Sequence, residues 1–484
     1  MDSPINPWRP LFFLLGTSLV LGALAMAFPQ GKVPGTNIKI PSIYGWLSDK
    51  GSESSSADSL LNGPMASSDT ELTLEALGTK NGKAWASLSK EERLQFEASD
   101  TTGLKPLVQR LRSIQSKGGR LRVLHFGDSQ IEGDRMTSLF REYFQKRFGG
   151  EGPSLQPIFP FVPSFSIQHT ASDQWKRYTH FGSTTWRVKS KKYGVMGLFA
   201  RFTSSESALG TDTVKAWVQF KPSSVAFSRA KTFSRIEWTY GNLRAPLRLV
   251  VKFNDTVYET RTLKPIEGIT SIEWRVTSTP RKVRLEFEGI DSPDAYGISF
   301  DGTAGISVDN IAMRGAAGVT FTSMDQVHFA EALQREPIGL ILLQFGGNAM
   351  PHVKDSAAIA RYGQSIALQI RRFKKWAPEA QIVLIGPSDM CIKQELEYVT
   401  YPNLEQIRNA LKSAAFKERV AFFDTYAFMG GEGSMKRWVE DAQPPLAGPD
   451  YIHFTPRGAR KAGEGMLKAI EAQLQKDGIG EKIP

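Results

Sequence analysis

Cysteine is nearly missing from this chain of 484 residues, which contains only Cys391. An intramolecular disulfide is therefore impossible, and a zinc site built on several cysteines is not expected. Histidine is also sparse, with six residues, no two of which lie within five positions of each other. The sequence thus lacks an HExxH or His-rich metal box, and it predicts neither a metal site nor a cofactor.

Acidic residues are fewer than basic ones, 49 Asp and Glu against 60 Lys and Arg, which leaves a net charge of +11. A positive balance favours polyanionic partners such as nucleic acid, anionic lipid or acidic glycan. No block of Lys and Arg stands out, so a basic, well-solvated surface is the alternative interpretation. We expect no nucleic-acid binding, because that function would not explain the strand-end residues described below.

Charged residues are absent from residues 10–29, "PLFFLLGTSLVLGALAMAFP", a stretch about long enough to span a bilayer. One interpretation of residues 1–29 is an uncleaved membrane anchor. The other is a signal peptide cut near "ALAMA". The leading "MDSPINPWR" has one Arg and one Asp, a weak signal n-region that favours the anchor. Either interpretation predicts that the remaining chain works outside the cytoplasm, in the periplasm or cell envelope.

The next segment, residues 30–103, is polar and rich in Ser, Gly and Lys, and "SDKGSESSSADS" has the composition of a flexible linker. Beyond it, residues 104–154 and 308–484 alternate short apolar runs with helical patterns, which predicts an α/β domain around a parallel sheet. The predicted strands are "LRVLHFG" from Leu121, "VDNIAMRG" from Val308, "IGLILLQFG" from Ile338, "QIVLIGPS" from Gln381 and "VAFFDTY" from Val420.

Helical patterns are lacking between these two parts, in residues 155–307, where strand-like alternation takes their place. "RKVRLEFEG" puts Val283, Leu285 and Phe287 on one face and charged side chains on the other. In "VVKFNDTVYETRTL" the pair Asn254-Asp255 separates two strand-like halves, which indicates a hairpin. We therefore predict a β-sandwich, jelly-roll-like, inserted in the α/β domain.

Residues suited to acyl transfer follow the predicted strands, where α/β sheets bind their ligands. Ser129 follows the first strand and could be a nucleophile, with His453 as its base and Asp450 as the acid that orients the imidazole. Asp128 would support this loop. The alternatives are structural: Ser129 as a helix N-cap, Asp128 as a loop-ordering acid, and Asp450 with His453 as a capping pair.

Three groups could stabilise an oxyanion: the backbone N–H groups of Ser129 and Gly315, and the side-chain amide of Asn348. A turn glycine and a loop amide are the alternatives for the latter two, and Gly194 and Gly197 are rivals of Gly315. Among the remaining candidates, we expect His125 to be a packed core residue and Cys391 to be inert.

Together "FGDSQ", Gly315, "GGN" and "DYIH" resemble the four blocks of the SGNH (GDSL) hydrolases, over roughly residues 104–154 and 308–475. The resemblance implies a flavodoxin-like, three-layer fold. The Gly-x-Ser-x-Gly elbow is absent, which argues against an ordinary α/β-hydrolase. The closer resemblance is to bacterial peptidoglycan O-acetylesterases and related periplasmic proteins, whose inserted carbohydrate-binding-like β-sandwich implies a glycan-binding role here. Sugar-stacking aromatics could be Trp175, Trp186, Trp217, Trp238 or Trp274, although Trp238 and Trp274 have the pattern of core residues.

The resemblance leads to three hypotheses. The first is an esterase that removes O-acetyl groups from an O-acetylated polysaccharide through an acetyl-serine. The second is an O-acetyltransferase that receives acetyl from a membrane-bound acyltransferase partner, using the same residues. The third is a non-catalytic glycan-binding envelope protein, which the intact set of site residues disfavours.

Overall fold

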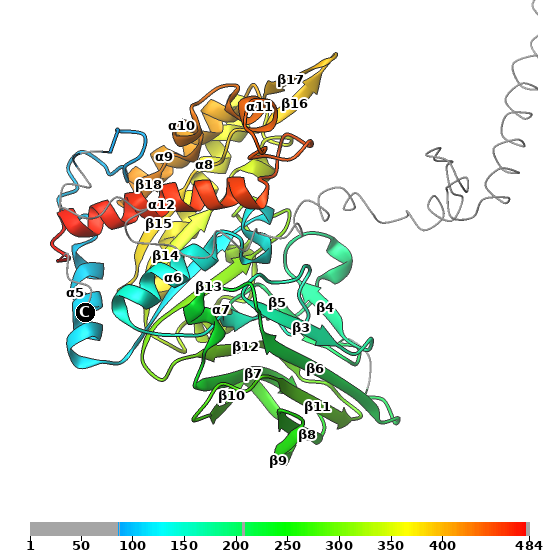
Figure 1. The fold of residues 1–484 in the computed structure, drawn as a ribbon. Helices are drawn as coiled ribbons and strands as arrows, with labels where there is room; N and C mark the ends of the chain where they lie inside the picture. The colour runs from blue at the N-terminus through cyan, green and yellow to red at the C-terminus, as the bar shows by residue number, and fades with distance from the viewer. Residues whose placement is uncertain (1–85, 87, 206–208, 481–484) are drawn as a thin grey trace, which may run out of the picture. The chain divides into compact units, whose positions relative to one another are not determined.

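The computed structural model describes residues 86, 88–205 and 209–480, and a five-stranded parallel sheet forms the centre of its α/β part (Figure 1). The strand order is β13-β1-β14-β15-β18, which in chain order is second, first, third, fourth, fifth. This is the flavodoxin-like order, so the predicted fold class is confirmed. The strands are β1 (Arg120–Gly127), β13 (Gly305–Ala312), β14 (Ile338–Gln344), β15 (Gln381–Ile385) and β18 (Ala421–Phe423).

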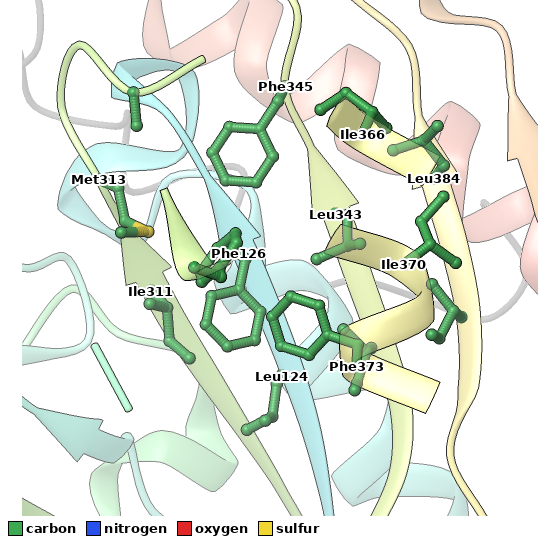
Figure 2. Close-up of a cluster of buried hydrophobic side chains, with 14 of the residues drawn as sticks. Leu124, Phe126, Ile311, Met313, Leu343, Phe345, Ile366, Ile370, Phe373 and Leu384 are labelled. Carbon is green, nitrogen blue, oxygen red and sulfur yellow. The ribbon is translucent and has the colours of Figure 1, made fainter. Parts of the chain in front are cut away.

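Helices cover both faces of this sheet. Because side chains alternate along a strand, β1 buries Val123 towards one helical layer and Leu124 and Phe126 towards the other. Figure 2 shows Leu124 and Phe126 beside Phe373 in the second layer. The first layer contains α5 (Lys105–Lys117), α6 (Thr137–Phe148) and α12 (Pro456–Lys476); the second contains α7 (Gln326–Leu333), α8 (Ser356–Trp376) and α9 (Leu404–Lys417).

Shorter elements lie near the end of the chain. They are the hairpin of β16 (Cys391–Gln394) with β17 (Glu397–Thr400), and the helices α10 (Thr425–Met429) and α11 (Ser434–Glu440). The hairpin meets the loop of the candidate site, since Cys391 N–H donates to the carbonyl of Tyr451 at 2.9 Å.

The insertion is a sandwich of two antiparallel sheets, as predicted. One has the order β10-β7-β12-β5-β4 with β2 added on β12, and the other has the order β3-β6-β11-β8-β9. Between β2 and β12 the described residues contain no α-helix. The strands are β2 (Ser154–Gln156), β3 (Ile167–Ala171), β4 (Lys176–Thr179), β5 (Leu198–Arg201), β6 (Val214–Pro222), β7 (Arg235–Leu243), β8 (Leu247–Phe253), β9 (Thr256–Leu263), β10 (Ile266–Arg275), β11 (Val283–Gly289) and β12 (Asp294–Asp301).

Two local predictions in the insertion are confirmed. Val283, Leu285 and Phe287 of β11 are buried in the core between the two sheets. Asn254 and Asp255 form the tight turn between β8 and β9, with φ of 51° and 70°. Positive φ at both central residues is what a two-residue hairpin turn requires.

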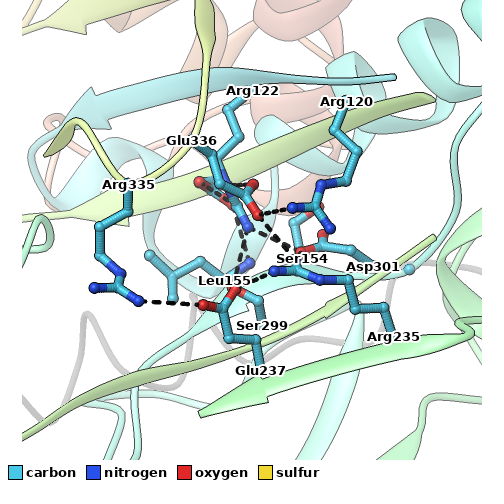
Figure 3. Close-up of polar contacts among 12 residues, drawn as sticks. Arg120, Arg122, Ser154, Leu155, Arg235, Glu237, Ser299, Asp301, Arg335 and Glu336 are labelled. Carbon is cyan, nitrogen blue, oxygen red and sulfur yellow. Dashed lines mark hydrogen bonds and ion pairs between the residues drawn. The ribbon is translucent and has the colours of Figure 1, made fainter. Parts of the chain in front are cut away.

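A buried ionic network ties the sandwich to the parallel sheet (Figure 3). Arg122 of β1 donates to both carboxylate oxygens of Asp309 on β13, at 2.7 and 2.8 Å, and to Asp301 of β12 at 2.9 Å. Glu336 lies 2.5 Å from Arg122 and 2.9 Å from Arg235 of β7. Multiple charge-assisted hydrogen bonds of this kind are directional, so the network fixes the orientation of the insertion on the α/β domain.

The predicted linker, residues 30–103, needs a correction at its end. Its residues 30–85 and the predicted anchor at 1–29 lie outside the described residues. Leu94, however, is buried in the core, and the backbone of Gln95 exchanges two 2.8 Å hydrogen bonds with Phe422 of β18. An edge strand leaves backbone groups unpaired, and this stretch pairs with them. No helix among the described residues is long and apolar enough to cross a membrane.

Candidate active site

Ser129 lies directly after β1, but it is not the cap of the following helix. The cap is Asp128, whose carboxylate accepts a hydrogen bond from Gln130 N–H at 3.0 Å. Ser129 begins a 3-10 helix of six residues, Ser129–Asp134, which non-helical backbone angles interrupt. The α-helix itself begins only at Thr137.

The structure brings Ser129, His453 and Asp450 together in one chain of hydrogen bonds. Ser129 Oγ lies 2.9 Å from His453 Nε2, and His453 Nδ1 lies 2.7 Å from Asp450 Oδ2. A carboxylate only accepts, so Nδ1 carries the proton and Nε2 has its lone pair directed at the serine hydroxyl. These distances are within the hydrogen-bond reach that a nucleophile and its base require.

Asp450 is held as a carboxylate by its own loop. Its Oδ1 accepts hydrogen bonds from the backbone N–H groups of Ile452 and His453, both at 3.0 Å. Burial raises the pKa of Asp450, but the hydrogen bonds from His453 and Ile452 outweigh burial and hold this pKa below its ordinary value. The acid is therefore ionised wherever the imidazole beside it could act as a base.

Gln130 positions the histidine loop, a role that the sequence analysis did not identify. Its Nε2 donates to the carbonyl of Ile452 at 2.7 Å, and its Oε1 accepts from Phe454 N–H at 3.3 Å. The two contacts bracket His453. The only sequence signal was adjacency to Ser129, since these partners lie more than 300 positions away.

Arg135 is a second positioning residue that the sequence analysis missed. Its buried guanidinium donates to the carbonyls of Ser129 and Gln130, both at 3.1 Å, and of Phe454 at 2.8 Å. Burial lowers its pKa to about 10, so it still carries its charge at neutral pH. One side chain thus ties the serine loop to the histidine loop.

The structure favours Gly315 over its rivals as an oxyanion donor. Gly194 N–H donates to the carbonyl of Leu198 at 3.3 Å, and Gly197 N–H donates to Gly194 at 2.8 Å. Within the part of the chain that the structure describes, no backbone acceptor is bonded to the N–H of Ser129 or Gly315. Gly315 has φ of +74° and open space where a Cβ would project.

Asn348 reaches the site, although its amide is already bonded. Nδ2 donates to Asp128 Oδ2 at 3.1 Å and to the carbonyl of Ala316 at 3.3 Å. Burial raises the pKa of Asp128 to about 6, against opposing hydrogen bonds from Gln130 and Asn348. Asp128 therefore lies between the serine loop and the amide, and it orients both.

His125 is a core residue, as predicted. It is fully buried, and its ring contacts Thr137 at 2.9 Å and Gln344 at 3.0 Å.

Burial, and after it the negative charge of Asp389, raises the pKa of the Cys391 thiol to about 11. This thiol therefore stays protonated and unreactive at neutral pH. Within residues 88–205 and 209–480, no three His, Cys, Asp or Glu side chains are grouped to hold a metal ion.

The tryptophans divide as their patterns indicate. Trp238 and Trp274 are buried, which confirms their predicted core position, and Trp175 is also buried. Trp217 lies beneath the guanidinium of Arg284, 4.0 Å from the ring centre. Trp186 is 45% exposed, so a sugar could reach its ring.

Comparison with known proteins matches residues 289–461 to the GDSL-like lipase/acylhydrolase family. This match includes Gly315, Asn348, Asp450 and His453, but it begins after Ser129. No curated protein sequence matches the chain.

A solved structure of a peptidoglycan O-acetylesterase is similar in fold, with a TM-score of 0.60, 19% identity, and coverage of 79% of this chain and 99% of that chain. A salicylyl-acyltransferase from a tetracycline biosynthetic pathway has 13% identity over 66% of this chain and 98% of that chain, with a TM-score of 0.28. A family two carbohydrate esterase from Clostridium thermocellum has 9% identity over 61% and 97%, with a TM-score of 0.25. The last two similarities are too low to support an argument about function.

Proposed function

We propose that this chain, whose residues 289–461 match the GDSL-like lipase/acylhydrolase family, removes O-acetyl groups from an envelope polysaccharide of the peptidoglycan type. The observation that carries this proposal is the hydrogen-bonded chain from Ser129 through His453 to Asp450. The fold similarity to a peptidoglycan O-acetylesterase makes acetylated peptidoglycan the first substrate to test. Action on such a polymer implies work outside the cytoplasm.

The proposed first step forms an acetyl-enzyme. Ser129 Oγ attacks the acetyl carbonyl while His453 Nε2 takes the hydroxyl proton, and Asp450 stabilises the resulting imidazolium. Collapse of the tetrahedral intermediate breaks the bond to the sugar oxygen, which receives the proton from His453. The sugar leaves with a free hydroxyl, and the acetyl group remains on Ser129.

The proposed second step repeats this chemistry with water. His453 takes a proton from a water molecule, whose oxygen attacks the acetyl carbonyl. The second intermediate collapses to acetate, and the proton returns to Ser129 Oγ. No group beyond these side chains is needed to balance either step.

The oxyanion of both intermediates would be stabilised by the backbone N–H groups of Ser129 and Gly315, which lack acceptors within the described chain. Asn348 would supply a third donor if Nδ2 exchanged its longer bond, at 3.3 Å to Ala316, for the oxyanion. Its bond to Asp128 would then keep the amide in place. This exchange is what distinguishes transition-state binding from the resting arrangement.

The test uses the full chain and its Ser129→Ala variant, with an aryl acetate and O-acetylated peptidoglycan as substrates and released acetate as the readout. We expect the variant to lose at least about 10³-fold in rate, as removal of a serine nucleophile does. Ser365→Ala is the matched control, because that hydroxyl bonds only a carbonyl of its own helix, α8. Comparable acetate release by Ser129→Ala would refute the mechanism.

The same assay separates the esterase from the acetyltransferase hypothesis. Ser129-dependent release from the glycan supports the esterase. Cleavage of the aryl ester alone, with acetyl appearing on an added sugar, would instead support transfer to a glycan hydroxyl. Absence of cleavage of either substrate would contradict the proposed function.

A further inference from the structure

A cavity of about 490 Å³ adjoins the candidate oxyanion donors. Gly315 and Ala316 form one wall, and residues 180–191 of the insertion contribute the other, with Arg187 and Lys191 among them. Ala316 is also the residue whose carbonyl accepts from Asn348. A substrate held with its acetyl group at Gly315 would therefore extend into this cavity.

The cavity is positively charged. Arg187 and Lys191 are exposed, and no Asp or Glu is among the described residues that line the cavity. Neither cation lies within ion-pair distance of a carboxylate in the described chain, and Arg187 has one long contact, 3.4 Å to the carbonyl of Gly182. The backbone holds Lys191 in place, since its carbonyl accepts from Asp325 N–H at 2.9 Å.

His180, on the same wall, has an incomplete set of hydrogen bonds. It is 7% exposed, and Nε2 lies 2.7 Å from Ser323 Oγ. Ser323 donates its proton to the carbonyl of Thr320 at 2.8 Å, so Nε2 must be the donor to Ser323. Nδ1 is then an acceptor without a partner among the described residues. Buried groups of this kind usually have one, which is the pattern expected where a ligand or water completes the wall.

The imidazole of His180 does not reduce the positive charge of the cavity. Burial, followed by the charges of Arg187 and Lys191, lowers the pKa of His180 to about 4. It is therefore neutral at physiological pH, and the charge of the cavity is that of the two cations.

Trp186 is an exposed aromatic residue next to Arg187 in the sequence. It is 45% exposed and directly precedes Arg187, at the end of a short turn capped by Ser183, whose hydroxyl accepts from Thr185 N–H. An exposed aromatic ring offers an apolar face for a sugar ring, and a guanidinium offers a charged fork for its anion.

We propose that this cavity binds a carboxylate carried by the sugar chain that bears the ester, so that the substrate is an acidic glycan. The inference rests on the proposed function and specifies its substrate class. Arg187 would pair with the carboxylate, Lys191 would add charge, and Trp186 would stack on the ring. A sugar acid carries its carboxylate on the ring or on a short branch, within reach of a cavity beside the ester-binding donors.

The test is calorimetric binding to the full chain, with a disaccharide that contains N-acetylmuramic acid and with its carboxyl methyl ester. Neither probe has an O-acetyl group, and the titrations use the full chain with Ser129→Ala, which cannot cleave the methyl ester. We expect the acid to bind roughly tenfold or more tightly than the ester, because a charge-assisted hydrogen bond is lost in the ester. This ratio should shrink at about 0.5 M salt, because salt at that concentration screens charges at an open cavity.

The variant that tests the residues is Arg187→Gln with Lys191→Gln, in which the binding ratio of acid to ester should approach one. The control is Lys117→Gln with Lys375→Gln, which removes the same charge from exposed positions at the C-terminal ends of α5 and α8. The control should keep the ratio of the unmodified chain.

Equal binding of acid and ester, or binding of neither, would overturn the inference. A stronger response to a sugar phosphate than to the carboxylate would overturn the choice of anion. These outcomes are separable from failure of the proposed function, which would appear as Ser129-independent acetate release and does not enter the binding measurement.

Discussion

Replacement of Gln130 by alanine would test how the catalytic geometry is maintained. The side chain donates to the carbonyl of Ile452 and accepts from Phe454 N–H, one residue on each side of His453. Within the described chain, its side chain forms no hydrogen bond with Ser129, His453 or Asp450. Gln130→Ala therefore releases the histidine loop while Ser129 keeps its hydroxyl and Asp450 its bond to the imidazole.

The expected size of the effect follows from these two contacts. Each hydrogen bond contributes about 1 kcal/mol to folding, so the free energy of unfolding should fall by about 1–2 kcal/mol. A shift of about 1 Å in a reacting group can cost about 100-fold in rate, or about 2.7 kcal/mol of transition-state stabilisation. Such a shift would lengthen the 2.9 Å contact between Ser129 and His453. We expect kcat to fall and KM to stay nearly constant, because Gln130 orients the base.

The assay is steady-state hydrolysis of an aryl acetate, with urea unfolding measured on the same preparations. The matched control is Gln334→Ala, whose amide makes a similar bond, 2.7 Å to the carbonyl of Trp376, at the end of α7. It should lose stability by about 1 kcal/mol with little change in kcat. If Gln130→Ala lost the expected stability yet kept its kcat within about threefold, the geometric argument would be refuted.

Three further predictions concern the site. Asp450→Asn should reduce kcat by at least about 10³-fold, because an amide permits the wrong imidazole tautomer; steady-state hydrolysis of the aryl acetate measures this. Since burial raises the pKa of Asp128 to about 6, its ionised form destabilises the folded chain above pH 6 by up to about 3 kcal/mol. As the pH falls from 7.5 to 4, the free energy of unfolding of the unmodified chain, relative to that of Asp128→Asn, should rise by about 2 kcal/mol in urea unfolding. A difference between the two chains that does not change with pH would contradict this. Gly315→Ala should cost about 1 kcal/mol for its φ of +74°. Gly318→Ala should cost more in thermal unfolding, because its Cβ would lie 2.7 Å from Phe345.

The sequence by itself was sufficient to predict the main strands and the fold class. Five apolar runs alternate with helical patterns, and all five became strands of the parallel sheet. Val283, Leu285 and Phe287 alternate with charges, and they are buried on one face of β11. These features were predictable because periodicity over a few residues decides which side chains can share a buried face.

The local turn after β1 was predicted less well. A serine before a helical pattern suggests an N-cap, yet Asp128 performs that role and Ser129 lies inside a short 3-10 helix. Neighbouring side chains of similar capping ability compete for the same N–H groups, so only the folded backbone decides between them. The end of the predicted linker was misplaced for a similar reason, since only β18 offers Gln95 its backbone partners.

The main residues of the candidate site were predictable from the sequence, whereas the tertiary structure determined their geometry. Residue types and strand ends indicated Ser129 and His453, but their 2.9 Å contact joins positions 324 residues apart. Sequence left Gly315 and its rivals open, and the use of their N–H groups in the fold separated them. The roles of Gln130 and Arg135 had no sequence pattern. Hydrogen bonds between distant loops depend on how sheet order and packing bring strand ends together, and no periodicity along the chain encodes that proximity.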